Sequence, residues 1–414
     1  MAKGRLKKTI SLLDATSIGI GAIVGAGIFV VLGVATGLAG SGVIFSIILA
    51  GAVAALTASS FVRLSMATQK EGGAYEFAYE FLSPFLAFLT GFLWIASNVV
   101  VGATVALGFS LYLSSLLPIL PVVPMAVVAC LVVTFLNYSS VRSSVSTNNA
   151  LVAVKLLTLL FFALVGFLFF KAGSFSGIGN APLGGVLSGA AIIFFAYGGF
   201  ARVTVVSEEV RNAKQNVYKA IILALAASTA IYLVVTVAAI GLGGAGKSSA
   251  SGAFLSSLMG STGVPYAVLI VSLGALAATG SVLLTDVLGV SRVLFSMARN
   301  EDAPRTFSVV DPASGVPKNA VLAAGIASAA LALIGNLALV ASVSSFALLA
   351  YYAVTNYAAM KVKARTYERA ISAAGLLSCF GLMAFLSHES LIVGIFLVLC
   401  GVAYYHWGKE RAPG

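Results

Sequence analysis

The hydrophobic pattern divides the chain into long apolar windows separated by short polar segments. Residues 15–62 and 81–141 carry no charge, and each window can hold two helices of about 20 residues, the length that crosses a bilayer. Glycines at 37–42 and prolines at 118, 121 and 124 divide them. The pattern predicts twelve transmembrane helices: two in 15–62, two in 81–141, one each in 149–170, 183–209, 217–241 and 264–298, two in 319–360 divided at 335–336, and one each in 370–386 and 391–407.

Between the seventh and eighth predicted helices, residues 243–263 are rich in glycine and serine. Such a composition is typical of a loop. We expect an external loop here, with a short surface helix at 253–259.

Composition supports a membrane protein. Of the 414 residues, 60% are hydrophobic and 9% are charged, whereas soluble domains average about 45–50% apolar and about 25% charged residues. The net charge of +11 does not indicate a nucleic-acid partner, because the basic residues lie singly between apolar spans. The cysteines Cys130, Cys379 and Cys400 lie in apolar runs without metal-binding spacing. We therefore expect an all-α protein of the lipid bilayer with no metal, cofactor or nucleic acid.

The basic residues also predict an orientation. With the N-terminus inside, twenty Lys and Arg side chains fall in the segments on that side, against only Lys171 and Lys247 opposite. Basic residues accumulate on the cytoplasmic side of membrane proteins. We therefore predict a multi-pass protein of the cell membrane, with residues 1–14 and 409–414 in the cytoplasm.

Three ionisable side chains, Lys155, Arg202 and Asp286, lie inside predicted spans. Such residues are costly in a bilayer and mark candidate functional sites. A structural ion pair is the alternative for each of them: Glu208 and Glu209 lie near Arg202 in sequence, and Asp286 could neutralise a lysine.

The first and sixth predicted helices share a second anomaly. Glycines 19, 21, 25 and 27 crowd the first helix, and the sixth contains the string FFAYGGF at 194–200. Such glycines could simply form a helix-packing face. Interruptions at corresponding places in two halves of a chain instead point to a transporter site near the middle of the membrane, where freed backbone N–H groups hold an anion.

These stretches, together with Gly73-Ala-Tyr75 and the string SRVLFSMAR at 291–299, give the chain a resemblance to the amino acid–polyamine–organocation superfamily. The resemblance implies a leucine-transporter-like fold of two five-helix inverted repeats, with helices 1 and 6 broken. The repeats would be residues 15–171 and 183–363, followed by two extra helices in 370–408.

The resemblance also implies a substrate site. The α-carboxylate of an amino acid would bind the backbone N–H groups of Ala26, Gly27 and Ile28. The ammonium would meet carbonyl groups at four positions: Ile23, Phe195, Ala196 and Gly198. Phe195 would also gate the site, and the side chains selecting the substrate would include Ser97, Asn98 and Arg202.

By the same resemblance, Lys155 matches a lysine that replaces a sodium ion between helices 1 and 8, near a small polar residue aligned with Ser281. Lys155 would either couple a proton to transport or replace the cation without coupling. Asp286, if it pairs with Lys155, would keep the lysine charged. Two departures stand out: Asn212-Ala213 replaces Asn-Pro, and Ala201 occupies a position that is often acidic or amide.

The sequence therefore predicts a secondary amino acid transporter, sodium-independent and proton-coupled, that works by alternating access. Small or medium neutral amino acids rank first as substrates, and the absence of an acidic side chain at Ala201 argues against cationic amino acids and polyamines. Acidic amino acids come second, if Arg202 faces the pocket. A facilitator or exchanger and a sensor that binds without transport are the alternatives, and the oligomeric state is open. An enzyme is not expected, because the spans contain no nucleophile–base pair.

Overall fold

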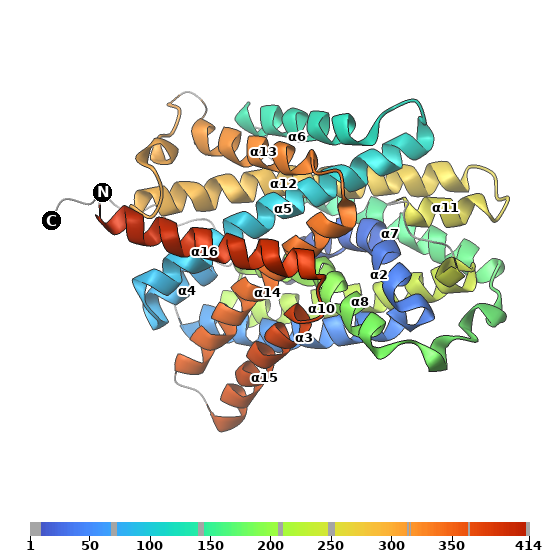
Figure 1. Ribbon diagram of the computed structural model, residues 1–414, viewed down its shortest axis with the longest axis horizontal. Coiled ribbons are helices and arrows are strands. Elements are labelled where there is room, and N and C mark those ends of the chain that lie inside the picture. Colours follow the sequence, from blue (N-terminus) through green and yellow to red (C-terminus); the bar gives the residue numbers. More distant parts are fainter. Residues whose placement is uncertain are drawn as a thin grey trace.

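The computed structural model describes residues 10–67, 73–139, 145–205, 210–246, 253–312, 314, 316–362 and 365–410. These residues form helices joined by short connections, with one isolated parallel β-bridge between Ile10 and Val210 (Figure 1). Glu208, Glu209 and Lys247, which entered the sequence predictions, lie outside the described residues.

The described residues of the first half of the chain form seven α-helices. They are α1 (Leu12–Ile23), α2 (Leu32–Ala39), α3 (Val43–Ala67), α4 (Ala74–Phe81), α5 (Pro84–Leu116), α6 (Val122–Tyr138) and α7 (Val145–Leu168). A π-helical turn, Gly27–Val31, precedes α2. Local sequence explains the boundaries: Ser83 caps α5 ahead of Pro84, and prolines occupy the connection from α5 to α6.

In the second half, the part of the chain that the structure describes forms nine α-helices. They are α8 (Leu183–Tyr197), α9 (Arg202–Val205), α10 (Ala213–Gly241), α11 (Phe254–Gly260), α12 (Ala267–Arg299), α13 (Lys318–Ala332), α14 (Leu337–Lys361), α15 (Thr366–Met383) and α16 (His388–Glu410). Gly335, at a φ of 71°, and the capping residue Asn336 separate α13 from α14, as the sequence predicts. Asn212, at a φ of 51°, makes the turn into α10 without the expected proline, since asparagine tolerates this left-handed conformation.

Eight segments of the described chain are long and apolar enough to cross a membrane. They are Leu12–Ala67, Pro84–Leu116, Asn149–Leu168, Leu183–Thr204, Gln215–Gly241, Ala267–Arg299, Leu337–Lys361 and His388–His406. Two shorter helices, α6 and α13, are also apolar. The chain is thus an all-helical membrane protein, and the count of twelve crossings stays a prediction.

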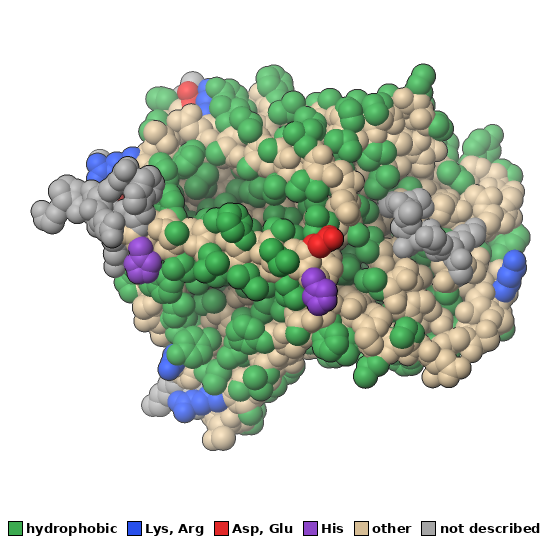
Figure 2. All heavy atoms as spheres, in the orientation of Figure 1, with side chains coloured by type: hydrophobic (Ala, Val, Ile, Leu, Met, Phe, Trp, Pro, Cys, Tyr) green, Lys and Arg blue, Asp and Glu red, His purple; other side chains and the backbone are tan. Residues whose placement is uncertain are grey.

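The outer surface is apolar. Hydrophobic side chains are spread across the whole visible face, and Lys and Arg side chains lie toward its margins (Figure 2). Phe135 of α6 and Phe396 of α16 are 68% and 65% exposed. A contiguous apolar exterior of this extent marks contact with lipid.

Inside the bundle, α5 packs against α12 and α14, α3 packs against α8, and α1 packs against α10. Figure 1 shows α4 at the left end of the molecule and α11 at the right end. We call these the α4 end and the α11 end.

The prediction of a surface helix at 253–259 is wrong. A short helix does form there, but the four apolar side chains of α11 are at most 1% exposed. Phe254 packs on Gly33 of α2, where an added β-carbon would lie 2.7 Å from the β-carbon of Phe254. Because a glycine leaves this space, the helix folds inward and closes the α11 end.

Candidate substrate cavity

The first interruption follows α1. Val24 leaves the helix at a ψ of 84°, and the helical path resumes at the turn Gly27–Val31. An added β-carbon at Gly25 would lie 2.5 Å from Val282 of α12, and one at Gly27 would collide with Ala196. Glycine is therefore required here for the close approach of α12 and α8, not only for flexibility.

The second interruption follows α8, where residues Gly198–Ala201 tighten into a 3-10 turn before α9. An added β-carbon at Gly199 would collide with the carbonyl of Ala22 and lie 2.7 Å from the backbone nitrogen of Ile23. The two interruptions are thus in direct backbone contact.

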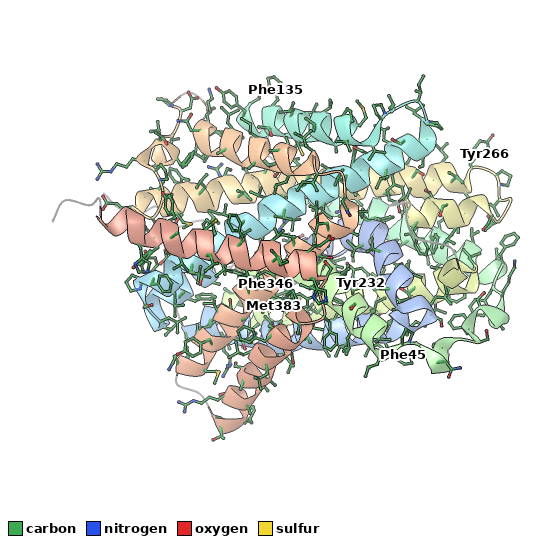
Figure 3. All side chains as sticks on the ribbon, in the orientation of Figure 1. Phe45, Phe135, Tyr232, Tyr266, Phe346 and Met383 are labelled. Atoms are coloured by element: carbon green, nitrogen blue, oxygen red, sulfur yellow. The ribbon has the colours of Figure 1, made fainter. Side chains whose placement is uncertain are left out.

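Two buried tyrosines, neither of which the sequence singled out, accompany the interruptions. The single hydroxyl proton of Tyr232 can donate to the carbonyl oxygen of Ile23 at 2.7 Å or of Ala196 at 3.1 Å. Tyr352 donates to the carbonyl of Gly198 at 2.7 Å. Figure 3 shows Tyr232 in the interior of the bundle. A tyrosine inside an apolar span needs a hydrogen-bond partner for its hydroxyl. The position of these two tyrosines in apolar spans could therefore have marked them as candidate site residues in the sequence.

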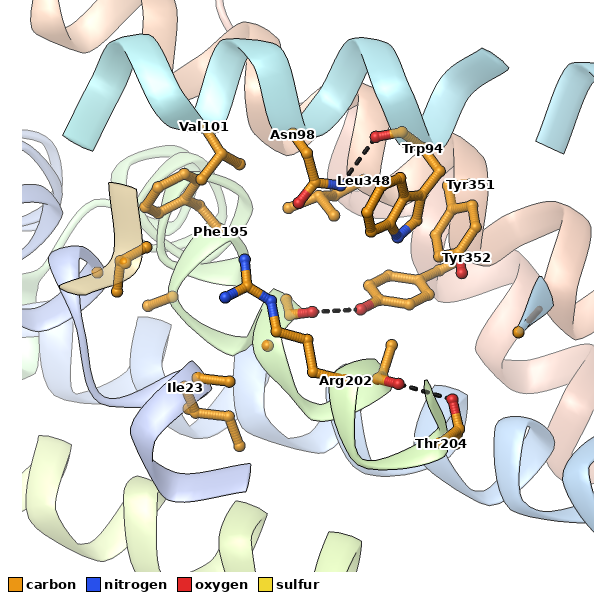
Figure 4. Close-up of a pocket in the computed structure, with 18 of the residues that line it drawn as sticks. Ile23, Trp94, Asn98, Val101, Phe195, Arg202, Thr204, Leu348, Tyr351 and Tyr352 are labelled. Atoms are coloured by element: carbon orange, nitrogen blue, oxygen red, sulfur yellow. Dashed lines mark hydrogen bonds between the residues drawn. The ribbon is translucent and has the colours of Figure 1, made fainter. Parts of the chain in front are cut away.

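A cavity of about 90 Å³, large enough for several water molecules, lies beside the interruptions (Figure 4). Its wall comes from helices far apart in sequence. The lining residues include Ile23, Ala26, Gly27, Gly73, Tyr75, Trp94, Asn98, Val101, Phe195, Ala196, Gly198, Arg202, Val282, Val293, Leu348, Tyr351 and Tyr352. Arg202 is the one charged side chain among the described residues that line it.

The predicted substrate site is largely assembled at this cavity. Eight of its ten residues line the wall: Ile23, Ala26, Gly27, Asn98, Phe195, Ala196, Gly198 and Arg202. The other two, Ile28 and Ser97, are completely buried and do not contribute to the lining. The amide nitrogen of Asn98, the neighbour of Ser97, donates to the carbonyl of Trp94 at 2.8 Å.

Arg202 projects into the cavity, toward the side where Phe195 and Asn98 lie (Figure 4). Its guanidinium donates to the carboxylate of Asp286 and, at 2.8 Å, to the hydroxyl of Thr285, both on α12. The ion pair of Asp286 is therefore with Arg202, across 84 residues of sequence, and not with Lys155.

Lys155 lies outside the cavity wall and is 3% exposed. Its ammonium donates to the carbonyl of Gly21 in α1 at 3.2 Å. The hydroxyl of Ser281 donates to the carbonyl of Ala278 in its own helix at 3.0 Å. Lys155 thus contacts the first interrupted helix, as the resemblance implied, while the described contact of Ser281 is local.

The described residues contain no group of three or more His, Cys, Asp and Glu side chains that could hold a metal ion. Backbone groups and one ion pair thus supply most of the polarity at the site.

A cavity beside two interrupted helices, inside an apolar helical bundle, is typical of a membrane transporter. A family model described as amino acid permease matches residues 14–413. The chain therefore belongs to the amino acid permease family.

Several relatives cover most of the chain. An uncharacterized transporter of Mycobacterium tuberculosis is 33% identical over 97% of this chain and 91% of its own length. A methylthioribose transporter of Bacillus subtilis is 32% identical over 88% of this chain and 83% of its own. A branched-chain amino acid permease of the same bacterium is 30% identical over 80% of this chain and 75% of its own length.

Proposed function

We propose that this protein is a secondary amino acid transporter that works by alternating access, independently of sodium and coupled to protons. The observation that carries the proposal is the backbone contact between the two interruptions beside the cavity. An amino acid carries an anionic and a cationic group at a fixed separation, and two interrupted helices supply donors and acceptors for both.

The α-carboxylate binds the helix that begins at the first interruption. The first N–H groups of a helix have no partner within it, and here they belong to Ala26, Gly27 and Ile28. The positive end of the helix dipole adds to the attraction. Ile28 takes part through its backbone, so its buried side chain does not conflict with this role.

The α-ammonium binds carbonyl oxygens around the two interruptions. Those of Ile23, Ala196 and Gly198 lie within reach of tyrosine hydroxyls, and that of Phe195 accepts the N–H of Gly198. A carbonyl oxygen has two lone pairs, so each can accept a further bond from the substrate. Phe195 also gates the cavity.

Lys155 couples transport to a proton. Its bond to the carbonyl of Gly21 ties α7 to the first interrupted helix. Loss of the proton would replace a charged donor by a neutral one, and hydrogen bonds to charged groups contribute about 1.5–3 kcal/mol. The end of α1, next to the substrate N–H groups at the first interruption, would then be released. Ser281 and Asp286, the other two residues proposed to take part in coupling, lie on α12, which packs against α7.

The remaining features follow from the same proposal. The protein crosses the cell membrane twelve times with both termini cytoplasmic, and residues 15–171 and 183–363 form inverted repeats. Apolar lining residues such as Val101, Val282 and Leu348 support neutral substrates, and the branched-chain permease among the relatives is consistent with them. Arg202 supports acidic substrates.

The test is uptake of radiolabelled amino acids into sodium-free proteoliposomes, with and without an inward proton gradient. We expect gradient-stimulated uptake of one amino acid class, abolished by Lys155→Ala and preserved by Lys171→Ala, a control at an exposed basic residue. Uptake at the same rate with and without the gradient would contradict proton coupling and indicate a facilitator or exchanger. Saturable binding without uptake would contradict transport and indicate a sensor.

A further inference from the structure

We infer that the substrate carries an anionic side group and that Arg202 binds it, with Asp286 and Thr285 as positioning residues. The inference rests on the proposed function and names its substrate class, an acidic amino acid. Its basis is the way in which the Arg202 guanidinium is held.

The guanidinium is anchored from one side. The Arg202 side chain is 26% exposed, whereas that of Asp286 is 1% exposed. Asp286 and Thr285 do not line the cavity, and Arg202 does. The Arg202 cation is therefore accessible from the cavity, whereas the Asp286 carboxylate lies buried behind it.

Anchoring leaves donors available. A guanidinium has five N–H groups in a rigid planar fork. The bonds to Thr285 and Asp286 use one on each terminal nitrogen, and no other partner of Arg202 is found among the described residues. Three donors remain for a second anion, and a planar fork suits a carboxylate.

The charges at the site also favour an anionic ligand. Of the ion pair between Arg202 and Asp286, only the cation lines the cavity, so the wall presents an excess of positive charge. A neutral amino acid leaves this excess uncompensated, and an acidic one cancels it. Because charge interactions are strong away from bulk water, the difference favours the acidic substrate and disfavours a cationic one.

The experiment compares ligands of nearly equal shape and different charge. Radiolabelled L-glutamate binding to the purified protein is measured in competition with L-glutamine, and L-aspartate is compared with L-asparagine. We expect the wild type to prefer each acid over its amide by about tenfold to a hundredfold, the range of one charged hydrogen bond.

Variants assign the preference to Arg202. Arg202→Gln removes the cation but leaves Asp286 buried and unpaired, so the double variant Arg202→Gln/Asp286→Asn provides a neutral version of the site. We expect that double variant to bind L-glutamine while losing the preference for L-glutamate. Retention of the preference without Arg202, or a wild type that prefers the amides, would overturn the inference.

Asp286 has its own readout as a positioning residue. Asp286→Asn is expected to raise KM for L-glutamate uptake more than KM for L-glutamine uptake, and Asp286→Glu to restore part of the loss. Equal changes for both ligands would mean a purely structural role.

Failure of the proposed transport function and failure of the inferred substrate class give different results. Preference for L-glutamate without uptake into proteoliposomes contradicts transport and supports the inference. Uptake of neutral amino acids without any preference for acidic ones supports transport and contradicts the inference of an acidic substrate.

Discussion

The two ends of the molecule are packed by different kinds of contact. At the α11 end, Phe29, Tyr112 and Phe254 are buried in the continuous hydrophobic core. The rings of Phe29 and Tyr112 meet edge to face at 6.4 Å, and the Tyr112 hydroxyl donates to the carbonyl of Phe29 at 2.6 Å. The closure is mostly apolar packing.

At the α4 end, a small cluster stands apart from that core. Its buried members are Tyr75, Phe88 and Met297. The hydroxyls of Tyr75 and Tyr79 donate to the carboxylate of Asp302, just beyond α12. Burial, reinforced by these bonds, raises the pKa of both tyrosines, so they remain protonated donors at neutral pH.

The contrast indicates which end opens more easily. Tyr75 and Gly73 line the cavity, so it extends toward the α4 end, while α11 closes the other. Regions with few buried apolar contacts open at lower free energy than the core. For the proposed alternating access, opening the α11 end therefore requires the larger disruption.

The largest effect is expected at the α11 end. Phe254→Ala should lower the free energy of unfolding by about 3–5 kcal/mol, because it leaves a cavity in a packed core. Thermal unfolding of the purified protein measures the loss. Phe135→Ala removes the same ring from the outer surface, where Figure 3 shows Phe135 at the edge of the bundle, and should have little effect. Similar losses in both variants would contradict the contrast.

At the α4 end, Asp302→Ala removes the acceptor shared by two tyrosines. Charged hydrogen bonds contribute about 1.5–3 kcal/mol, so we expect a smaller loss of stability and a more open end. A water-soluble thiol reagent should label Val293→Cys, a lining position, faster in the Asp302→Ala variant. The exposed native Cys400 is first replaced by serine. Glu301→Ala removes a neighbouring exposed carboxylate and should leave the rate unchanged.

Where the two interruptions meet, Gly199→Ala adds one methyl group against the backbone of Ala22. Overpacking of this kind costs about 1–3 kcal/mol, and we expect amino acid binding to weaken with it. Gly173→Ala is the control, because an added β-carbon there meets nothing within 4 Å. Unimpaired binding in the Gly199 variant would show that this contact is not needed.

The smallest effect is expected in the connection between α12 and α13. Hydrogen bonds from the hydroxyl and N–H of Ser314, helped by Lys318, lower the pKa of Asp311. Asp311 therefore stabilises the fold above its unfolded pKa of about 3.9, and this stabilisation disappears as pH falls through the lower folded value. Asp311→Asn should lower Tm slightly at pH 7 and not at all below the folded pKa. An equal decrease at both pH values would exclude ionisation as the cause.

The sequence anticipated the helices and both interruptions, because charge-free windows and clustered glycines are local features. It also predicted Arg202 and Phe195 as site residues, and both line the cavity. It did not anticipate the pairing of Arg202 with Asp286 or the contacts of Tyr232, since these depend on helices far apart in the chain. The buried α11 was missed because a short apolar segment among glycines and serines gives no sign that Gly33 leaves space for Phe254.

The central claim is that an amino acid binds between the two interruptions. A structure of the purified protein with a saturating transported amino acid tests it most directly. We expect the α-carboxylate about 2.7–3.2 Å from the N–H groups of Ala26, Gly27 and Ile28, with the side chain directed toward Arg202. Substrate density at another place in the molecule, with this cavity containing only water, would contradict the account.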